Sequence, residues 1–269
     1  MLFAVTVVVL AYGCLWLGQW QFRRLHDREA LNAQTRANLS GAPAEVGSVL
    51  APGRPSRVRN EWRRVTARGT YVPDRSVVIR YQTRDGASGV DVVTPLRTAS
   101  GTSLLVDRGW LATDNVGVDK VDAPAPPSGP VTVVGFVRAD ATGSAATVAD
   151  RSARAISSVQ IGRALRIPVY GGFVDLERET PAPRRALEPA DPPDLGNGPH
   201  FFYGLQWWFF GVLAVFGFGY LAYDERRKLL GAGRESPGSR GPPQRPRSEG
   251  PEHPAVDRQH HAGDEAGRR

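Results

Sequence analysis

The sequence predicts a membrane protein in which two transmembrane α-helices flank a β-rich extracytoplasmic domain, an antiparallel barrel or sandwich with minor α structure. Three observations lead to this prediction. The apolar residues of the 269-residue chain are concentrated in two uncharged blocks, one near each end. Each block is about as long as a helix that crosses a bilayer. Between them lie short β-type runs separated by turn residues, a pattern typical of antiparallel β domains.

Residues 1–22 form the first predicted transmembrane helix. From Leu2 to Trp20 no residue is charged over 19 residues, and a helix of this length is about 28 Å long, close to the hydrocarbon thickness of a bilayer. The alternatives are a cleaved signal peptide and a lipoprotein signal at Cys14. The start of the chain has no basic residue, and bulky side chains occupy the positions where cleavage would fall, so we favour a retained helix.

Residues 23–57 are expected to form a polar helix, Leu25–Leu39, followed by a linker rich in Gly, Pro, Ala and Ser. Residues 58–177 form the predicted β domain. A hairpin turn is expected at residues 97–102, and a short helix at Gln160–Arg166. The candidate strands are Arg63–Tyr71, Ser76–Thr83, Val90–Arg97, Ser103–Trp110, Val131–Arg138, Ala155–Val159 and Val169–Leu176.

Residues 178–199 are rich in proline and glycine and are expected to be a second tether, leading into the second transmembrane helix at residues 200–223. Phe201 to Tyr223 is a run of 23 residues without a charge, which is too long and too apolar for an ordinary soluble helix. The basic cluster Arg226–Lys228 follows it and predicts a cytoplasmic C-terminal end by the positive-inside rule. The central domain then lies outside the cytoplasm.

Two features complicate this prediction. Arg23 and Arg24 would lie on the outer side, against the positive-inside rule, but long domains cross the membrane largely regardless of charge. Residues 224–269 are expected to be a cytoplasmic tail that is disordered beyond about residue 231. The histidines of the tail could form a metal site, but we favour a solvated tail because no packed shell would hold the ligands. These histidines are His253, His260 and His261.

Composition disfavours several classes of function. The net charge is +7, but the arginines are scattered without a basic face or a nucleic-acid motif, so we expect no nucleic acid partner. Between residues 27 and 199 the sequence has no histidine and no cysteine, which rules out a Ser-His-Asp or Cys-His catalytic set in the β domain. Asp91, Asp107 and Asp114 are expected to be turn and strand-end residues. We therefore expect a non-enzymatic protein.

His200 is the informative histidine because it stands at the start of the second helix. On a helix it shares a face with Tyr203, Gly204 and Trp207, and an imidazole there could be an axial ligand of haem iron. The alternative is an interfacial histidine that caps the helix, with the aromatic residues as a membrane belt. In the ligand interpretation, residues from both helix ends complete the site: Tyr203, Trp207, Trp16 and Trp20 against the macrocycle, and Arg23 or Arg24 with its propionates.

Five sequence segments together resemble the Surfeit locus protein 1 family, whose members are assembly factors for cytochrome c oxidase. The resemblance extends over residues 15–228, and the sequence departs from the family pattern at Asp107, where the family often has asparagine. The tail beyond residue 230 is an addition of the kind seen in high-GC bacteria. The matching segments are LGQWQFRR at 17–24, RRVTARGTY at 63–71, VVTPL at 92–96 with LLVDRGW at 104–110, GFVR at 135–138 and PHFFYGLQW at 199–207.

The resemblance implies a chaperone-like factor of the respiratory chain in the cell membrane of a bacterium, with two membrane spans. It implies delivery or retention of haem a for the catalytic subunit of the oxidase, with His200 as the ligand. The other expected contacts are those of the ligand interpretation above, Tyr203, Trp207, Trp20 and Arg24, and binding is expected to be transient. Haem a synthase is a further candidate partner, and the lipid bilayer is the medium. The rival hypothesis is a cofactor-free membrane scaffold that holds an oxidase subunit during assembly.

Overall fold

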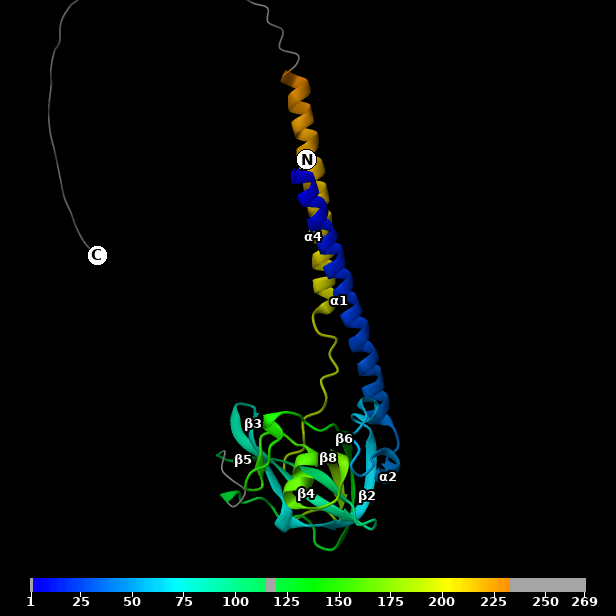
Figure 1. The fold of residues 1–269 in the computed structure, drawn as a ribbon, viewed down its shortest axis with the longest axis vertical. Helices are drawn as coiled ribbons and strands as arrows, with labels where there is room; N and C mark the ends of the chain where they lie inside the picture. The colour runs from blue at the N-terminus through cyan, green and yellow to red at the C-terminus, as the bar shows by residue number, and fades with distance from the viewer. Residues whose placement is uncertain (1, 115–119, 233–269) are drawn as a thin grey trace, which may run out of the picture. The chain divides into compact units, whose positions relative to one another are not determined.

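A computed structural model describes residues 2–114 and 120–232 of the chain. Of the tail predicted at residues 224–269, residues 224–232 continue the second long helix instead of forming a tail, because nothing in them interrupts the helix before Gly231. Residues 233–269, with the three histidines, lie outside the described residues. The helices and strands are α1 (Leu2–Ser40), β1 (Ala44–Glu45), α2 (Val46–Val49), β2 (Arg64–Tyr71), β3 (Val77–Arg84), β4 (Ala87–Thr98), β5 (Ser103–Ala112), β6 (Pro130–Arg138), β7 (Ser152–Ala153), α3 (Ser158–Leu165), β8 (Val169–Thr180) and α4 (His200–Ala232), with short 3₁₀ turns at Val58–Asn60, Pro73–Arg75 and Ser144–Ala146 (Figure 1).

Helix α1 is continuous, whereas the sequence predicted a membrane helix and a separate polar helix. No glycine or proline occurs between Gly18 and Gly41, so nothing interrupts the backbone hydrogen bonds where the apolar residues give way to polar ones. The helix ends at Ser40, directly before Gly41. In the described part of the chain, α1 and α4 are the two helices long and apolar enough to cross a membrane.

The strands form one mixed sheet in the order β1-β2-β6-β8-β5-β4-β3-β7. Strand β2 also pairs with β4 through three residue pairs, which closes a circuit of five strands by a short seam, too short to make a clear barrel. The sequence predicted an antiparallel arrangement, but β5 pairs with β8 in parallel. This pairing requires the crossover that β6 and α3 supply between the two strands, a long-range arrangement that strand patterns do not reveal.

Apolar side chains form two buried clusters in the sheet domain. One includes Val65, Leu96, Leu104 and Val133, and the other includes Val77, Ile79, Leu105 and others beside α3. Leu104 and Leu105 are adjacent in β5 and point to opposite faces, as alternation along a strand requires. Strand β5 is therefore covered on both faces, which explains its nearly continuous burial.

Six of the seven predicted strands are present, with ends that differ by a few residues, and the turn before β5 is the predicted hairpin. The predicted strand Ala155–Val159 is wrong. Strand pairing stops at Ala153, and α3 begins at Ser158, two residues earlier than the predicted helix. The carboxylate of Asp140 accepts hydrogen bonds from the backbone and the hydroxyl of Ser158 at 2.6 Å each. This contact satisfies an N-terminal N–H group of the helix.

The segment 178–199 is packed against the rest of the chain rather than serving as a simple tether. Its first residues extend β8 to Thr180, and Leu187 is buried. Glu188 and Trp110 exchange two backbone hydrogen bonds of 2.7 and 3.1 Å. Gly109 has φ +124°, and a side chain there would collide with the carbonyl of Glu188. Glycine at position 109 thus allows the segment to lie against β5.

Candidate functional site

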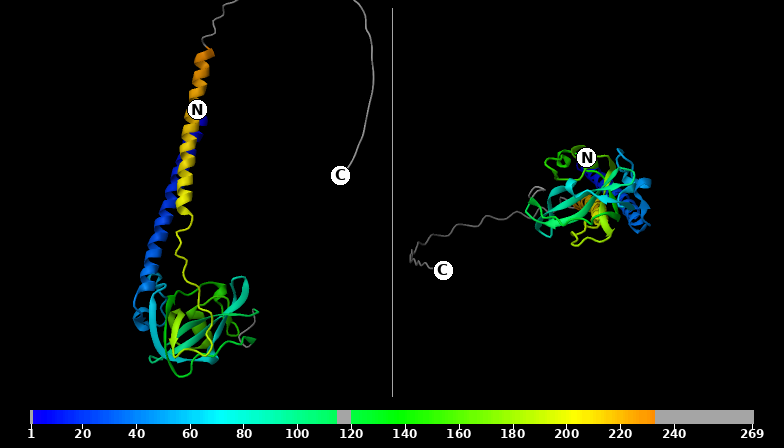
Figure 2. Two further views of the ribbon diagram at one scale, coloured as in Figure 1. Left: turned by 180° about the vertical axis from the view of Figure 1, so that it is seen from behind. Right: turned by 90° about the horizontal axis from the view of Figure 1, so that it is seen from below.

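Helix α1 and the part of α4 up to Val215 lie side by side and antiparallel, and aromatic rings of each pack on glycines of the other (Figures 1 and 2). The indole of Trp208 lies directly on Gly18. The ring of Phe22 lies on Gly204, where an added Cβ would be 2.8 Å from the ring. The rings of Phe22 and Trp208 contact each other at a centroid distance of 4.8 Å. Both glycines are buried, so a larger residue at either position would separate the helices.

His200 lies at the end of this contact where α4 begins. Its ring nitrogen Nδ1 is 2.9 Å from the side-chain oxygen Oε1 of Gln21 on α1, and its side chain is half-buried. The face of α4 that contacts α1 is His200, Gly204, Trp208 and Gly211, a helical spacing. The hydrogen bond therefore continues the same row of interhelical contacts.

Residues 194–197, shortly before His200, are hydrogen-bonded to α1 and so fasten the start of α4 to that helix. The amide of Asn32, which is buried, donates to the carbonyl of Leu195 at 3.0 Å and to the side chain of Asn197 at 3.2 Å. Arg28 donates to the carbonyl of Gly196 at 3.1 Å and pairs with Asp194. We name residues 194–197 with their partners on α1 the latch. Because it holds the chain just before His200, the latch sets the register between the two helices at the site.

The structure does not bring all the predicted site residues together. His200 contacts α1 as described. The residue of α1 that reaches the imidazole ring of His200 is Gln21, not Trp20. Trp20 is 41% exposed and carries the guanidinium of Arg24 over its ring at 5.6 Å, so these two residues form their own pair on α1. Tyr203 is 46% exposed. The ring of Trp207 makes an edge contact with Phe210 at 6.1 Å along α4.

Sequence reasoning missed Gln21, Phe22 and Trp208 as site residues. All three lie in or beside the quoted segments LGQWQFRR and PHFFYGLQW, so their positions were available. The signal that could have found them is the helical spacing of Gly204, Trp208 and Gly211, which marks the face of α4 that contacts α1. Helical spacing counted from His200 predicted Trp207, but the face of α4 that contacts α1 includes Trp208, one position later.

The site offers one imidazole nitrogen as a possible metal ligand, beside exposed aromatic side chains. When Nδ1–H donates to Gln21, the other ring nitrogen Nε2 carries the lone pair that a metal needs. Exposed aromatic side chains surround the start of α4, including Phe201 at 46%, Phe202 at 73% and Tyr203. They offer flat apolar surface beside a single nitrogen donor. Among the described residues, no group of three or more His, Cys, Asp or Glu side chains is placed to hold a metal ion.

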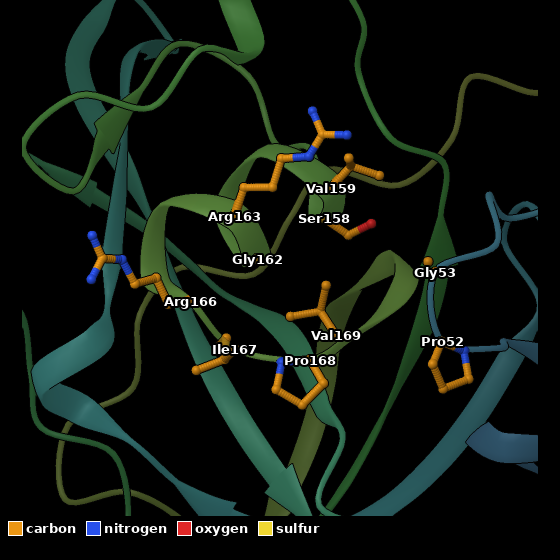
Figure 3. Close-up of a pocket in the computed structure, with 11 residues that line it drawn as sticks. Pro52, Gly53, Ser158, Val159, Gly162, Arg163, Arg166, Ile167, Pro168 and Val169 are labelled. Atoms are coloured by element: carbon orange, nitrogen blue, oxygen red, sulfur yellow. The ribbon is translucent and has the colours of Figure 1, made fainter.

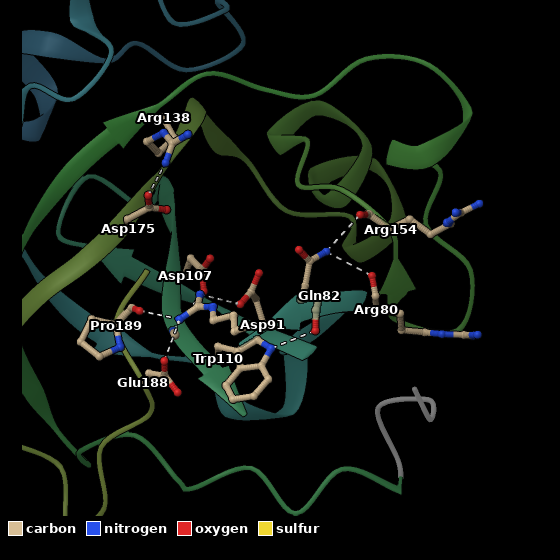
Figure 4. Close-up of polar contacts among 12 residues, drawn as sticks. Arg80, Gln82, Asp91, Asp107, Trp110, Arg138, Arg154, Asp175, Glu188 and Pro189 are labelled. Atoms are coloured by element: carbon tan, nitrogen blue, oxygen red, sulfur yellow. Dashed lines mark hydrogen bonds and ion pairs between the residues drawn. The ribbon is translucent and has the colours of Figure 1, made fainter. Parts of the chain in front are cut away.

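A second polar cluster lies inside the sheet domain, where Asp91, Asp107 and Asp175 come from β4, β5 and β8 (Figure 4). Asp91 and Asp107 were predicted at turns and strand ends, but both lie within strands and Asp107 is 4% exposed. Burial, opposed by Arg84, raises the pKa of Asp91 to about 6. Burial together with the charges of Asp91 and Asp175 raises the pKa of Asp107 well above its ordinary value.

Arginines hold this cluster together. Arg84 pairs with Asp91 at 3.2 Å and donates to the carbonyl of Pro189 at 2.6 Å, which fastens the segment after β8. Arg138 pairs with Asp175 at 2.7 Å and lies 4.0 Å over the ring of Trp62. The sequence segment GFVR thus has a structural role, since its arginine neutralises a buried carboxylate. Asp114, by contrast, follows the end of β5 and is exposed, as predicted.

A surface hollow of about 650 Å³ lies between α3, the start of β8 and the Pro52–Gly53 turn (Figure 3). The guanidinium groups of Arg163 and Arg166 point outward from its rim. The hydroxyl of Ser158 donates to Asp140 and accepts from the backbone of Gly172, so this polar group is already used by the fold. We assign no function to the hollow.

Comparison with known proteins identifies one family. The model of the SURF1 family matches residues 8–212. The chain is 31% identical to an uncharacterised SURF1-like protein of Mycobacterium tuberculosis over 249 residues, which cover 90% of this chain and 89% of that protein. It is 34% identical over 119 residues to a SURF1-like protein of Monosiga brevicollis, covering 40% of this chain and 42% of the relative. It is 26% identical over 107 residues to the cytochrome oxidase assembly protein SHY1 of Saccharomyces cerevisiae, covering 39% of this chain and 26% of the relative.

Proposed function

Because the chain belongs to the SURF1 (Surfeit locus protein 1) family, we propose that it takes part in the assembly of cytochrome c oxidase. The support is the family match over most of the chain and the printed role of the yeast relative. In this proposal the chain associates with the oxidase during assembly and is not itself an enzyme.

The specific role that we propose is a carrier of haem a, which it hands to the catalytic subunit of the oxidase. The observation that carries this role is His200, an imidazole at the start of α4 whose Nδ1 is hydrogen-bonded to Gln21 of α1. In the tautomer with the hydrogen on Nδ1, the lone pair of Nε2 is available to a metal. His200 Nε2 would hold the iron of a bound haem a. A single nitrogen donor among exposed aromatic side chains suits a cargo that must be released. Haem a synthase is the partner that would supply the cargo.

We propose that α1 and α4 cross the cell membrane of a bacterium and that the sheet domain lies outside the cytoplasm. Both helices are long and apolar enough for this placement. Large apolar side chains on α4 such as Phe209 and Val212 are more than half exposed, which is expected for a surface that faces lipid. The basic cluster Arg226–Lys228 supports a cytoplasmic C-terminal end of α4.

The carrier role is tested by purifying the protein from cells that make haem a and recording the visible spectrum and the haem-to-protein ratio. We expect haem a to co-purify with the wild type and to be lost from His200→Ala. The matched control is His26→Ala, because His26 is an exposed histidine on α1 that pairs with Glu29, three residues later on the same helix. A wild-type protein without haem, or an unchanged haem content in His200→Ala, would contradict the carrier role.

A scaffold without cofactor is the second candidate function, and one surface feature favours it. Tyr81 lies at a bulge of β3 with φ +63° and is 51% exposed. The guanidinium groups of Arg80 and Arg154 lie 4.9 and 5.2 Å from its ring centroid. A bulky residue in the left-handed region is strained, and Tyr and Arg are typical of binding hot spots.

The two functions predict different sensitive positions. We choose Tyr81→Asn because asparagine adopts the left-handed backbone conformation readily. Under the scaffold function, Tyr81→Asn abolishes recovery of oxidase subunits in a pull-down, whereas His200→Ala does not. Under the carrier function, Tyr81→Asn keeps haem a bound and His200→Ala loses it. Measuring both haem content and co-purified oxidase subunits in both variants separates the two functions.

A further inference from the structure

We propose that Gln21 is the positioning residue of His200: its side-chain oxygen accepts the hydrogen of Nδ1 and thereby fixes the ring tautomer that leaves Nε2 free to bind a ligand. This inference rests on the proposed carrier function and adds to it a residue of α1 that sets the state of the imidazole on α4.

The geometry restricts what the hydrogen bond can be. The side-chain oxygen of a glutamine only accepts hydrogen bonds, so at 2.9 Å from Gln21 Oε1 the ring nitrogen Nδ1 must carry the proton. In a neutral imidazole one nitrogen carries the hydrogen and the other the lone pair. Nε2 then has the lone pair, which is the arrangement that binds a metal. If the glutamine amide instead donated to Nδ1, Nε2 would carry the hydrogen and could not be a ligand.

Contacts on either side hold both partners in place. Phe22, the next residue after Gln21, is fixed on Gly204 and contacts Phe201 at a centroid distance of 6.2 Å. Gly198, two residues before His200, has φ +64° and lies close to the ring, since an added Cβ would be 3.4 Å from His200 Cδ2 and 3.5 Å from Nε2. Glycine at this position therefore keeps a side chain away from Nε2. The latch fastens the residues before Gly198 to α1. The ring is therefore oriented by a hydrogen bond within a rigid setting, as in metal sites where an outer partner sets the ligand.

The experiment compares Gln21→Met, which has similar length and no acceptor, with Gln21→Glu, which keeps an acceptor. Gln19→Met is the matched control because Gln19 is an exposed glutamine on the same helix. We measure the dissociation constant for added haemin in detergent and, after reduction of the bound iron with dithionite, the iron–histidine stretching frequency in resonance Raman spectra. We expect Gln21→Met to weaken binding about tenfold to a hundredfold, as removal of outer partners does, and to lower the stretching frequency. Gln21→Glu keeps tight binding and raises the frequency, because a carboxylate pulls more strongly on Nδ1–H.

A purely structural role for Gln21 gives a different result. It would change the unfolding temperature in Gln21→Met while leaving the stretching frequency of the haem that still binds at its wild-type value. If Gln21→Glu loses haemin as Gln21→Met does, Gln21 is the donor rather than the acceptor, and the proposal is wrong. Wild-type affinity and frequency in Gln21→Met, with haem lost from His200→Ala, would also overturn it while the carrier function survives.

A readout without haem keeps the inference testable if the carrier function fails. Nitrogen NMR of protein labelled with ¹⁵N-histidine distinguishes the two neutral tautomers, and His200→Ala assigns the signal. We expect the Nδ1–H tautomer in the wild type and in Gln21→Glu, and a mixture of tautomers in Gln21→Met. An Nε2–H tautomer in the wild type would overturn the proposal, whatever the protein binds.

Discussion

Asp107 is a carboxyl group that the fold makes difficult to ionise. It is 4% exposed, it lies beside Asp175 in the parallel pairing of β5 and β8, and its one backbone donor is Gly109 at 3.0 Å. Burial raises its pKa most, and the charges of Asp91 and Asp175 raise it further. A raised pKa in the folded state means that the folded protein binds more protons than the unfolded chain above the ordinary pKa.

The sign of the resulting pH dependence follows from this raised pKa. For Asp91 the pKa rises from 3.8 to about 6, so stability is greatest below the lower value and falls as the pH rises through this window. Asp107 extends the fall to higher pH because its pKa is also raised. We therefore expect the unfolding temperature of the protein in detergent to fall between about pH 4 and pH 7, since each pKa unit corresponds to about 1.4 kcal/mol.

Asp107→Asn removes the cost of ionising this group without changing its shape. We expect a higher unfolding temperature at pH 7.5, by a few °C for each ~1 kcal/mol of relief, and a weaker pH dependence above pH 6. The amide oxygen can still accept from Gly109. The measurement is a thermal melt from pH 4 to pH 8, with Asp114→Asn as the exposed control. A lower unfolding temperature at pH 7.5 in Asp107→Asn would show that ionised Asp107 stabilises the fold.

At this same scale, the sequence predicts the identity of His200 but not its partner. Helical spacing assigns residues to faces within one helix, whereas the pairing of Gln21 with His200 depends on the register between two helices. That register is set by the latch, whose contacts join residues more than 150 positions apart. The buried state of Asp91 and Asp107 was missed for the same reason, because their burial depends on which strands pair.

The helix pair makes a direct prediction at the scale of the element. An added Cβ at Gly211 would be 3.2 Å from the Cβ of Cys14, slightly closer than the usual 3.5–4.5 Å of a disulfide. Cys14 is the single cysteine of the chain. We expect Gly211→Cys to form an intramolecular disulfide with Cys14 under mild oxidation after a small shift of the helices. The product is detected by its altered mobility on a non-reducing gel.

The control for this crosslink is Val212→Cys, because Val212 follows Gly211 directly on α4 and its side chain is 51% exposed. We expect little crosslinking in Val212→Cys and none in Gly211→Cys combined with Cys14→Ser. Equal crosslinking of the two positions would mean that α4 has no fixed face toward α1, and the contact between Gln21 and His200 would then lose its structural basis.

Most individual elements of the sheet domain could be predicted from the sequence, because alternation and turn residues are local signals. Strands β2 to β6 and β8 were predicted from such local signals. The parallel pairing of β5 with β8 and the seam between β2 and β4 could not be predicted, since both join distant residues. The wrong strand at Ala155–Val159 has a similar origin, because the contact that starts α3 comes from Asp140, 18 positions before Ser158.

At the scale of the whole molecule, the latch and the helix pair act together. Asn38 near the end of α1 donates to the carbonyls of Arg59 and Glu61 before β2, and Asn32 donates to the segment that leads into α4. Helix α1 is thus fastened to both the beginning and the end of the sheet domain. The contact between Gln21 and His200 follows from these attachments. In the proposed membrane placement, this contact requires both residues to lie on one side of the membrane.

This last requirement gives a topological prediction. In a Cys14→Ser background, single cysteines at Ala30, Pro192 and Glu225 report three exposed positions of the chain. We expect a membrane-impermeant maleimide to label Ala30→Cys and Pro192→Cys in intact spheroplasts, because both flank the proposed extracytoplasmic domain. Glu225→Cys lies beside the basic cluster Arg226–Lys228 and should be labelled only after lysis. If Ala30→Cys and Pro192→Cys are labelled from opposite sides, α1 and α4 do not bring Gln21 and His200 to one membrane face. The carrier function and the positioning role of Gln21 would then both fail.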